Sequence, residues 1–74
     1  MDKKFQETIK IIMSAIKEKG YDPIAQITGY LIYKDSSYIT RHKNARGLIE
    51  ALDFDQLNEY ITQIKKHQNI KRKS

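Results

Sequence analysis

The chain has 74 residues, no cysteine and an excess of basic side chains, with 14 Lys and Arg against 9 Asp and Glu. A chain of this length forms one small domain, and without cysteine it can hold neither a disulfide nor a thiolate zinc site. His42 and His67 lie too far apart in the sequence to indicate a metal site, so we expect no metal and no cofactor. Because so small a core usually needs a further source of stability, we expect a homodimer.

The excess positive charge lies at the C-terminal end. The last ten residues hold five Lys and Arg and no acid, and the rest of the chain has nine of each. We therefore predict one domain over residues 1–66 and a basic, disordered tail over residues 67–74. We interpret the tail as a solvated end, with an anchor for nucleic acid or an acidic surface as the alternative. No apolar run approaches the roughly 20 residues that span a bilayer, so we expect a cytoplasmic protein without membrane insertion.

The first half of the chain has helical periodicity. Apolar residues over residues 2–19 recur at steps of three and four, and Gly20 follows where a left-handed cap is needed. Asp22 and Pro23 are typical of a helix start, which predicts a second helix over residues 23–33. Gly29 inside it is explained either by close approach of another helix or by a tolerated weak point. The side chains predicted to be buried are Phe5, Ile9, Ile12, Met13, Ile16, Ile24, Ile27, Tyr30 and Leu31.

The second half begins with a polar turn and a short helical turn near residues 36–39. A third helix is predicted from Thr40, as its N-cap, to Leu52. Asp53 and Gln56 match a capping box that opens a last helix ending near residue 66. The side chains predicted to be buried here are Ala45, Leu48, Ile49, Leu52, Phe54, Leu57, Tyr60, Ile61 and Ile64. The sequence therefore predicts an all-α fold, a compact bundle of four main helices.

A basic cluster of Arg41, His42, Lys43 and Arg46 stands at the start of the third predicted helix. Cations at this end oppose the helix dipole, so their position needs an explanation. Three remain open: a solvated or internally paired face, a surface for a protein partner, and a recognition helix that contacts nucleic acid. The connection over residues 33–40 is longer than in most helix-turn-helix motifs, which counts against the last.

No pattern of catalytic residues is present. The chain has no nucleophile elbow, no glycine-rich phosphate loop and no HExxH pair. His42 has no acidic partner placed beside it by sequence spacing. We therefore expect a non-enzymatic protein. Its five tyrosines, at positions 21, 30, 33, 38 and 60, indicate either packing at the edge of the core or a protein interface.

The central residues resemble a known family in order and spacing. They are Tyr21, Asp22, Pro23, Gln26, Ile27, Gly29, Tyr30, Leu31, Asp35, Tyr38, Ile39, Thr40, His42, Asn44, Ala45, Arg46, Leu48 and Ile49. This pattern is similar to the IreB family of small Firmicutes regulatory phosphoproteins. The resemblance implies a small helical homodimer that acts by protein–protein interaction in a cell-envelope stress pathway linked to a Ser/Thr kinase.

The resemblance also directs attention to particular side chains. The motif or interface candidates are Tyr21, Asp22, Pro23, Gln26, Gly29, Tyr30, Tyr38, Thr40, His42, Asn44 and Arg46. Family members carry an acidic N-terminal extension with phosphorylated threonines, whereas this chain starts close to the first predicted helix, so we expect a divergent member without it. Thr8 and Ser36 are then the candidate phosphosites. The alternative function is a small helix-turn-helix-like protein that binds nucleic acid through the Arg41–Arg46 helix and the basic tail.

Overall fold

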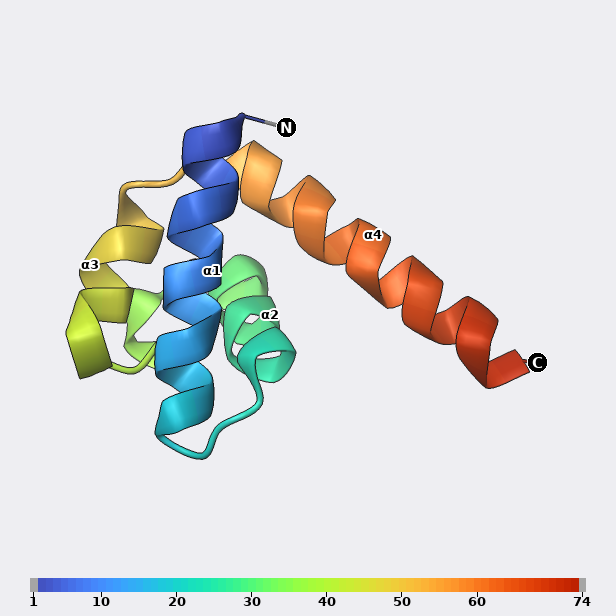
Figure 1. Cartoon of the computed structure of the whole chain (residues 1–74), viewed down its shortest axis with the longest axis horizontal. Helices are drawn as coiled ribbons and strands as arrows, with labels where there is room; N and C mark the ends of the chain where they lie inside the picture. The colour runs from blue at the N-terminus through green and yellow to red at the C-terminus, as the bar shows by residue number, and fades with distance from the viewer. Residues whose placement is uncertain (1, 74) are drawn as a thin grey trace.

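The computed structural model describes residues 2–73, with side chains described over residues 2–67. Within this range it contains four α-helices, two 3₁₀ turns and no strand, which confirms the predicted all-α fold (Figure 1). In chain order the elements are α1 (Lys3–Glu18), α2 (Pro23–Tyr33), η1 (Ser36–Tyr38), η2 (His42–Asn44), α3 (Ala45–Glu50) and α4 (Phe54–Lys73). None of the described helices is both long and apolar enough to cross a membrane.

The end of α1 follows the sequence prediction. Gly20 has a φ of +85°, a conformation that glycine adopts without a steric penalty. The Gly20 amide donates to the carbonyl of Lys17 at 2.9 Å, and the Tyr21 amide donates to that of Ile16 at 3.2 Å. These two bonds form a Schellman motif, which satisfies carbonyls at the helix end and turns the chain toward α2.

The core lies where α1 meets α2, α3 and the start of α4. The fully buried side chains are Phe5, Ile9, Ile12, Ala15, Ile16, Ile27, Ile39, Ala45, Ile49, Leu57 and Ile61. Nine of them were predicted, whereas Ala15 and Ile39 were not. The remaining predicted core residues are only partly buried: Met13, Ile24, Tyr30, Leu31, Leu48, Leu52, Phe54, Tyr60 and Ile64. In the described part, the core is therefore centred on α1.

The predicted third helix from Thr40 to Leu52 is wrong. The structure has the short turn η2 and then α3, which covers only six residues. Lys43 and Asn44 have φ values of 52° and 60°, so both residues lie outside the right-handed helical region and interrupt the helix. Asparagine is one of the few residue types that enter this left-handed conformation readily.

The last helix starts where it was predicted and runs further. The Asp53 carboxylate accepts a hydrogen bond from the Gln56 amide at 3.0 Å, as an N-cap does. The backbone of α4 continues to Lys73, beyond the predicted end, and the helix extends away from the other three (Figure 1). The change from domain to disordered tail at residue 67 stays a prediction, and Ser74 lies outside the described residues.

Candidate functional site

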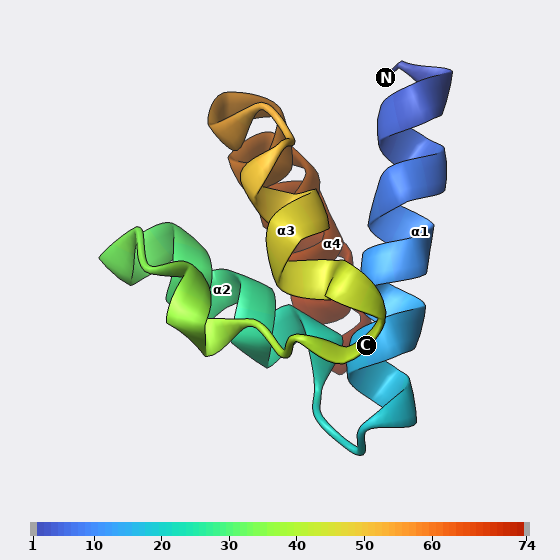
Figure 2. The ribbon, with the colours of Figure 1, turned by 90° about the vertical axis from the view of Figure 1, so that its left-hand side faces the viewer.

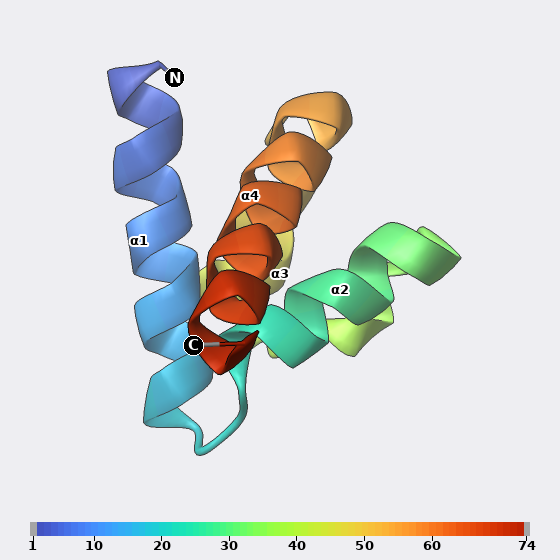
Figure 3. The same ribbon diagram turned by 90° about the vertical axis from the view of Figure 1, so that its right-hand side faces the viewer.

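The segment between α2 and α3, residues 34–44, is here called the α2–α3 connection. It leaves the outer end of α2 and runs back alongside that helix toward the body of the molecule (Figure 2). The opposite view shows α2 projecting sideways from the other helices (Figure 3). Most of the predicted site residues lie on or around this connection.

Side chains from the two flanking helices bind the backbone of the connection. Gln26 of α2 accepts a hydrogen bond from the Thr40 amide at 3.2 Å through its Oε1. Arg46 of α3 donates from Nε to the Ile39 carbonyl at 3.0 Å and from Nη2 to the Ser37 carbonyl at 3.4 Å. Because Ile39 is completely buried, these bonds also hold one core side chain in place. Gln26, Thr40 and Arg46 therefore position this segment.

The left-handed turn before α3 is stabilised by several local contacts. The Thr40 hydroxyl accepts from the His42 amide at 3.2 Å, and the Thr40 carbonyl accepts from the Arg46 amide at 3.1 Å. Thr40 is thus bound to the first residue of η2, whose N-cap position is Arg41, and does not cap a long helix as predicted. The Asn44 side chain lies directly over Gly47, where an added Cβ would come within 2.5 Å of Asn44 Oδ1. The absence of a side chain at Gly47 makes room for this arrangement.

Glu18 connects the end of α1 to the same turn. Its carboxylate contacts His42 Nε2 at 2.9 Å and Lys43 Nζ at 3.0 Å, one oxygen each. The hydrogen bonds from His42 and then from Lys43 lower the pKa of Glu18 below its usual range. His42 therefore does have an acidic partner, 24 residues earlier in the chain, which the sequence spacing did not reveal.

These contacts change the interpretation of the basic cluster. Arg41, His42 and Lys43 precede α3 instead of opening it, and Arg46 is bound to backbone carbonyls. The helix on which the nucleic-acid alternative depended is therefore not formed as predicted. Internal pairing accounts for His42, Lys43 and Arg46, while Arg41 is exposed.

An aromatic group lies where the connection meets α2. The ring of Tyr38 covers Gly29, whose added Cβ would lie 2.9 Å from Tyr38 Cδ1. The same ring stacks on Tyr33, with centroids 5.1 Å apart and planes 13° from parallel. The close approach expected at Gly29 is therefore made by a side chain of η1, not by another helix. Tyr33 and Tyr38 are 63% and 45% exposed, so the pair stays accessible to solvent.

A second aromatic contact faces α4. The rings of Tyr30 and Phe54 lie 5.9 Å apart, and the Lys34 ammonium lies 5.8 Å from the Phe54 ring centroid. Burial, and secondarily the nearby Glu50 carboxylate, raises the pKa of the Tyr30 hydroxyl. Tyr30 thus anchors α2 to α4 and belongs to the packing, not to the exposed pair.

The other end of α2 is shaped by Tyr21, Asp22 and Pro23. Asp22 accepts from the Ile24 amide at 3.0 Å and Pro23 occupies the first helical position, as predicted. Tyr21 is 54% exposed. These residues set the start of α2, at the opposite end of the helix from Tyr33.

The candidate phosphosite Ser36 opens η1. Its hydroxyl donates to the Glu50 carboxylate of α3 at 2.5 Å. The neighbouring Asp35 accepts from the Ser37 amide at 3.0 Å, and these bonds from Ser37 lower the pKa of Asp35. The Ser36 hydroxyl is therefore held by Glu50, while the carboxylate of the preceding residue, Asp35, is bound to Ser37.

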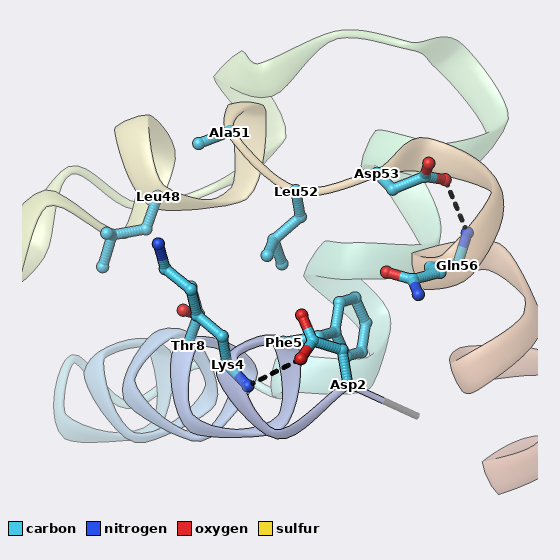
Figure 4. A pocket seen from close by; sticks show the side chains of 9 residues that line it. All are labelled: Asp2, Lys4, Phe5, Thr8, Leu48, Ala51, Leu52, Asp53 and Gln56. Carbon is cyan, nitrogen blue, oxygen red and sulfur yellow. Dashed lines mark hydrogen bonds between the residues drawn. The ribbon is translucent and has the colours of Figure 1, made fainter.

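The candidate phosphosite Thr8 lies elsewhere, in a groove of about 380 Å³. Figure 4 shows the groove between the first turns of α1 and the junction of α3 and α4. Its lining residues are Asp2, Lys4, Phe5, Thr8, Leu48, Ala51, Leu52, Asp53 and Gln56. Acidic and basic groups are mixed here, with Asp2 and Asp53 bound to backbone amides. The groove has no marked charge preference.

The structure brings together seven of the predicted residues around the connection: Gln26, Gly29, Tyr38, Thr40, His42, Asn44 and Arg46. Sequence reasoning missed the two carboxylates that bind the connection: Glu18, which contacts His42, and Glu50, which accepts from Ser36. They stand 24 and 14 residues from their partners, and no local pattern marks them. Across the described residues no three His, Asp or Glu side chains gather as a metal ion would need. The arrangement fixes a backbone segment and presents an aromatic pair.

The chain is similar to known proteins over most of its length. The family model described as IreB regulatory phosphoprotein matches residues 1–71. A UPF0297 protein of Clostridioides difficile (strain 630) is 51% identical over 55 residues, which is 74% of this chain and 65% of that relative. The match therefore spans less than two-thirds of the relative's length. The UPF0297 and IreB families are the same. The chain belongs to the IreB regulatory phosphoprotein family.

Proposed function

We propose that this chain is a non-enzymatic regulatory protein that acts by binding other proteins. The observation that supports this most directly is the exposed Tyr33–Tyr38 stack, held beside α2 by the contacts of Gln26 and Arg46. Tyrosine is enriched in protein interfaces because its ring offers a large area and its hydroxyl a hydrogen bond. A rigid aromatic pair also loses little conformational entropy on binding.

The family supports a more specific role within the same proposal. A regulatory phosphoprotein accepts a phosphoryl group, so we infer that the protein works in a pathway with a Ser/Thr kinase. We further propose that it acts in the cytoplasm and as a homodimer. The small core and the lack of cysteine are consistent with both the dimer and a reducing compartment.

A pull-down from the native host tests partner binding. The wild-type chain and Tyr21→Ala, a control at an exposed tyrosine away from the stack, are expected to recover the same kinase or phosphatase. Tyr38→Ala, which removes half of the stack, is expected to lose it. Equal recovery of that partner by the Tyr38→Ala protein contradicts the proposed surface.

Incubation with the cognate kinase and ATP, followed by mass spectrometry, tests the phosphorylation step. Labelling is expected at Ser36 or Thr8. A phosphate on Ser36 would stand beside Glu50 and Asp35, so repulsion is expected to loosen the α2–α3 connection. A Thr8→Ala, Ser36→Ala double variant is the control: undiminished labelling of it rejects these two sites, and an unlabelled wild type rejects the kinase link.

A further inference from the structure

The outer side of α1 carries three lysines in one line. Lys3, Lys10 and Lys17 stand seven residues apart, which is almost two helical turns, so they share one side of the helix at intervals of about 10 Å. All three are exposed. Among residues 2–67 the only carboxylate that forms an ion pair is that of Glu18, and neither of its partners belongs to this line. The positive charge of the three lysines, which we call the lysine line, is therefore not neutralised within the described part of the chain.

The lysine line makes α1 more basic than the body of the molecule. Residues 1–64 hold nine basic and nine acidic side chains, so their charges balance. Within α1, however, four lysines stand against two acids, Glu7 and Glu18. Glu18 is already bound by His42 and Lys43, so it does not offset the lysine line. An excess of one charge on one side of a protein attracts partners of the opposite charge.

A shallow hollow lies beside the lysine line, between α1 and the turn η2. Its volume is about 270 Å³, and its lining residues are Lys10, Ile11, Ser14, Ala15, Glu18 and Lys43. Ala15 is fully buried and has the smallest side chain of the six, so it forms the floor. Ile11 is 51% exposed and forms an apolar wall. The hollow therefore offers an apolar contact directly beside the ammonium group of Lys10.

The combination of charge and apolar contact selects the class of partner. A nucleic acid would meet the lysine line with its phosphates, which neutralise the lysines but give Ile11 no apolar contact. An acidic protein segment can pair its carboxylates with the lysines and place one apolar side chain against Ile11. Both features of the surface are then used, with the apolar contact enclosed by charged groups as in other protein interfaces.

We propose that the outer side of α1 is a docking surface for an acidic segment of a partner protein. Carboxylates of the segment pair with the lysine line, and an apolar side chain of the segment lies in the hollow against Ile11. The charge pairs speed the encounter and set the orientation, and the apolar contact adds affinity. We call this surface the α1 face, and it consists of Lys3, Lys10, Ile11 and Lys17.

The α1 face lies away from the aromatic pair. In the two side views α1 and α2 stand at opposite edges of the molecule (Figures 2 and 3). Tyr33 is the last residue of α2, and it stacks on Tyr38 of η1. The inference therefore goes beyond the proposed binding through the two tyrosines, and each surface can be tested without the other.

Fluorescence anisotropy with the full chain and a labelled synthetic peptide tests the α1 face. The probe is a peptide of about 15 residues with glutamates around one central leucine, since a helix of this length spans the lysine line. The wild type is expected to bind it about fivefold or more tightly than the same peptide with glutamine in place of leucine. Ile11→Gln is expected to remove this preference. Lys10→Glu is expected to weaken binding at least about tenfold.

The matched control is Lys66→Glu. It makes the same charge reversal at an exposed lysine of α4, outside the α1 face, and is expected to change the affinity about twofold or less. Amide NMR shifts locate the bound peptide and are expected to change at Ile11 and Ser14. Circular dichroism checks that each variant keeps its helices.

The outcomes decide between the possible partners. Weaker binding by Lys10→Glu, loss of the leucine preference in Ile11→Gln and shifts along α1 support the α1 face. A wild type that does not bind the peptide at low salt overturns it. So does an equal loss in Lys66→Glu, which would show attraction by net charge only.

Two further measurements separate the alternatives. Duplex DNA that binds the wild type more tightly than the peptide, and loses its affinity in Lys10→Glu, overturns the protein partner in favour of nucleic acid. Tyr38→Ala is expected to bind the peptide like the wild type, so failure of the proposed tyrosine surface leaves this result unchanged. Loss of peptide binding in a folded Tyr38→Ala protein contradicts the location on α1.

Discussion

The helices α1 and α2 meet in the same core but differ in what they show to solvent. Five side chains of α1 are fully buried, and six of its sixteen residues are charged and stand on the outer side. The helix α2 buries only Ile27 completely and has no charge among its eleven residues. Apart from Ile11, which is 51% exposed, α1 divides its residues between an apolar inner side and a charged outer side, and α2 does not.

The difference separates two roles within one small fold. The inner side of α1 supplies five of the eleven fully buried side chains, more than any other helix, so α1 contributes most to the stability of the single chain. The apolar outer side of α2 adds little to that stability, because Ile32 and Tyr33 stay exposed to solvent, and exposed apolar side chains of this kind are typical of an interaction surface. The predictions below test this division of roles, from the largest expected effect to the smallest.

Core truncation in α1 is expected to have the largest effect. Ile12→Ala removes a fully buried side chain and is expected to lower the free energy of unfolding by about 2–5 kcal/mol. Ile32→Ala in α2, at an exposed position, is expected to change it by about 0.5 kcal/mol or less when the protein is dilute. Urea unfolding at low protein concentration measures both. Equal losses would remove the distinction between the two helices.

Loss of the Arg46 side chain is expected to come next. Arg46→Ala leaves the Ile39 and Ser37 carbonyls without their donor, which is expected to cost about 1–3 kcal/mol of unfolding free energy. Arg41→Ala, at an exposed position five residues earlier, is the matched control, with an expected change of about 0.5 kcal/mol or less. Thermal unfolding compares the two. An Arg46→Ala protein with the same stability as the wild type would show that packing alone holds the connection.

Gly29→Ala tests the contact between α2 and η1. Alanine favours the helix by about 1 kcal/mol, but its Cβ would lie 2.9 Å from the Tyr38 ring, so the net effect is expected to be destabilising by about 1 kcal/mol. In a Tyr38→Ala background the obstacle is gone, and the same substitution is expected to stabilise by about 1 kcal/mol. A double-mutant cycle by urea unfolding measures this change of sign. The same effect of Gly29→Ala in both backgrounds would contradict the close contact.

The smallest expected effect is the pH dependence from Glu18. Its pKa is lowered in the folded chain by His42 and Lys43, so its contribution is present above the ordinary value of 4.5 and is lost as the pH falls through the lowered pKa. Glu18→Gln is therefore expected to lower the melting temperature near about pH 6 and to lose this effect toward about pH 3. Glu7→Gln, on the same helix and exposed, serves as the control. A Glu18→Gln difference that is constant across this range would contradict the pairing.

Local sequence patterns were sufficient to predict the first two helices and the start of α4. Gly20, Asp22 with Pro23, and Asp53 each act on backbone groups within five residues, so their effect can be predicted without the fold. The core positions of α1 follow from periodicity in the same way. The family motif includes seven residues that lie around the α2–α3 connection, whereas Tyr21, Asp22 and Pro23 lie at the start of α2 and Tyr30 packs against Phe54.

The break between η2 and α3 could not be predicted in this way. Residues 40–52 have a helical apolar pattern, and a left-handed Lys43 is not indicated by its own side chain. The turn forms because Glu18 binds Lys43 and because Arg46 and Gln26 bind the connection, and these contacts come from other elements. Tertiary contacts thus overrode local helix propensity at this point.

The way in which the α2–α3 connection is attached also bears on its motions. It is fastened largely by single hydrogen bonds from Gln26, Arg46 and Ser36, with one buried anchor at Ile39. Breaking a few such bonds releases the segment while α1 and its core stay folded. Amide hydrogen exchange at Thr40 and Ile39 should then report a local opening well below the global unfolding energy, and a docked partner would slow it.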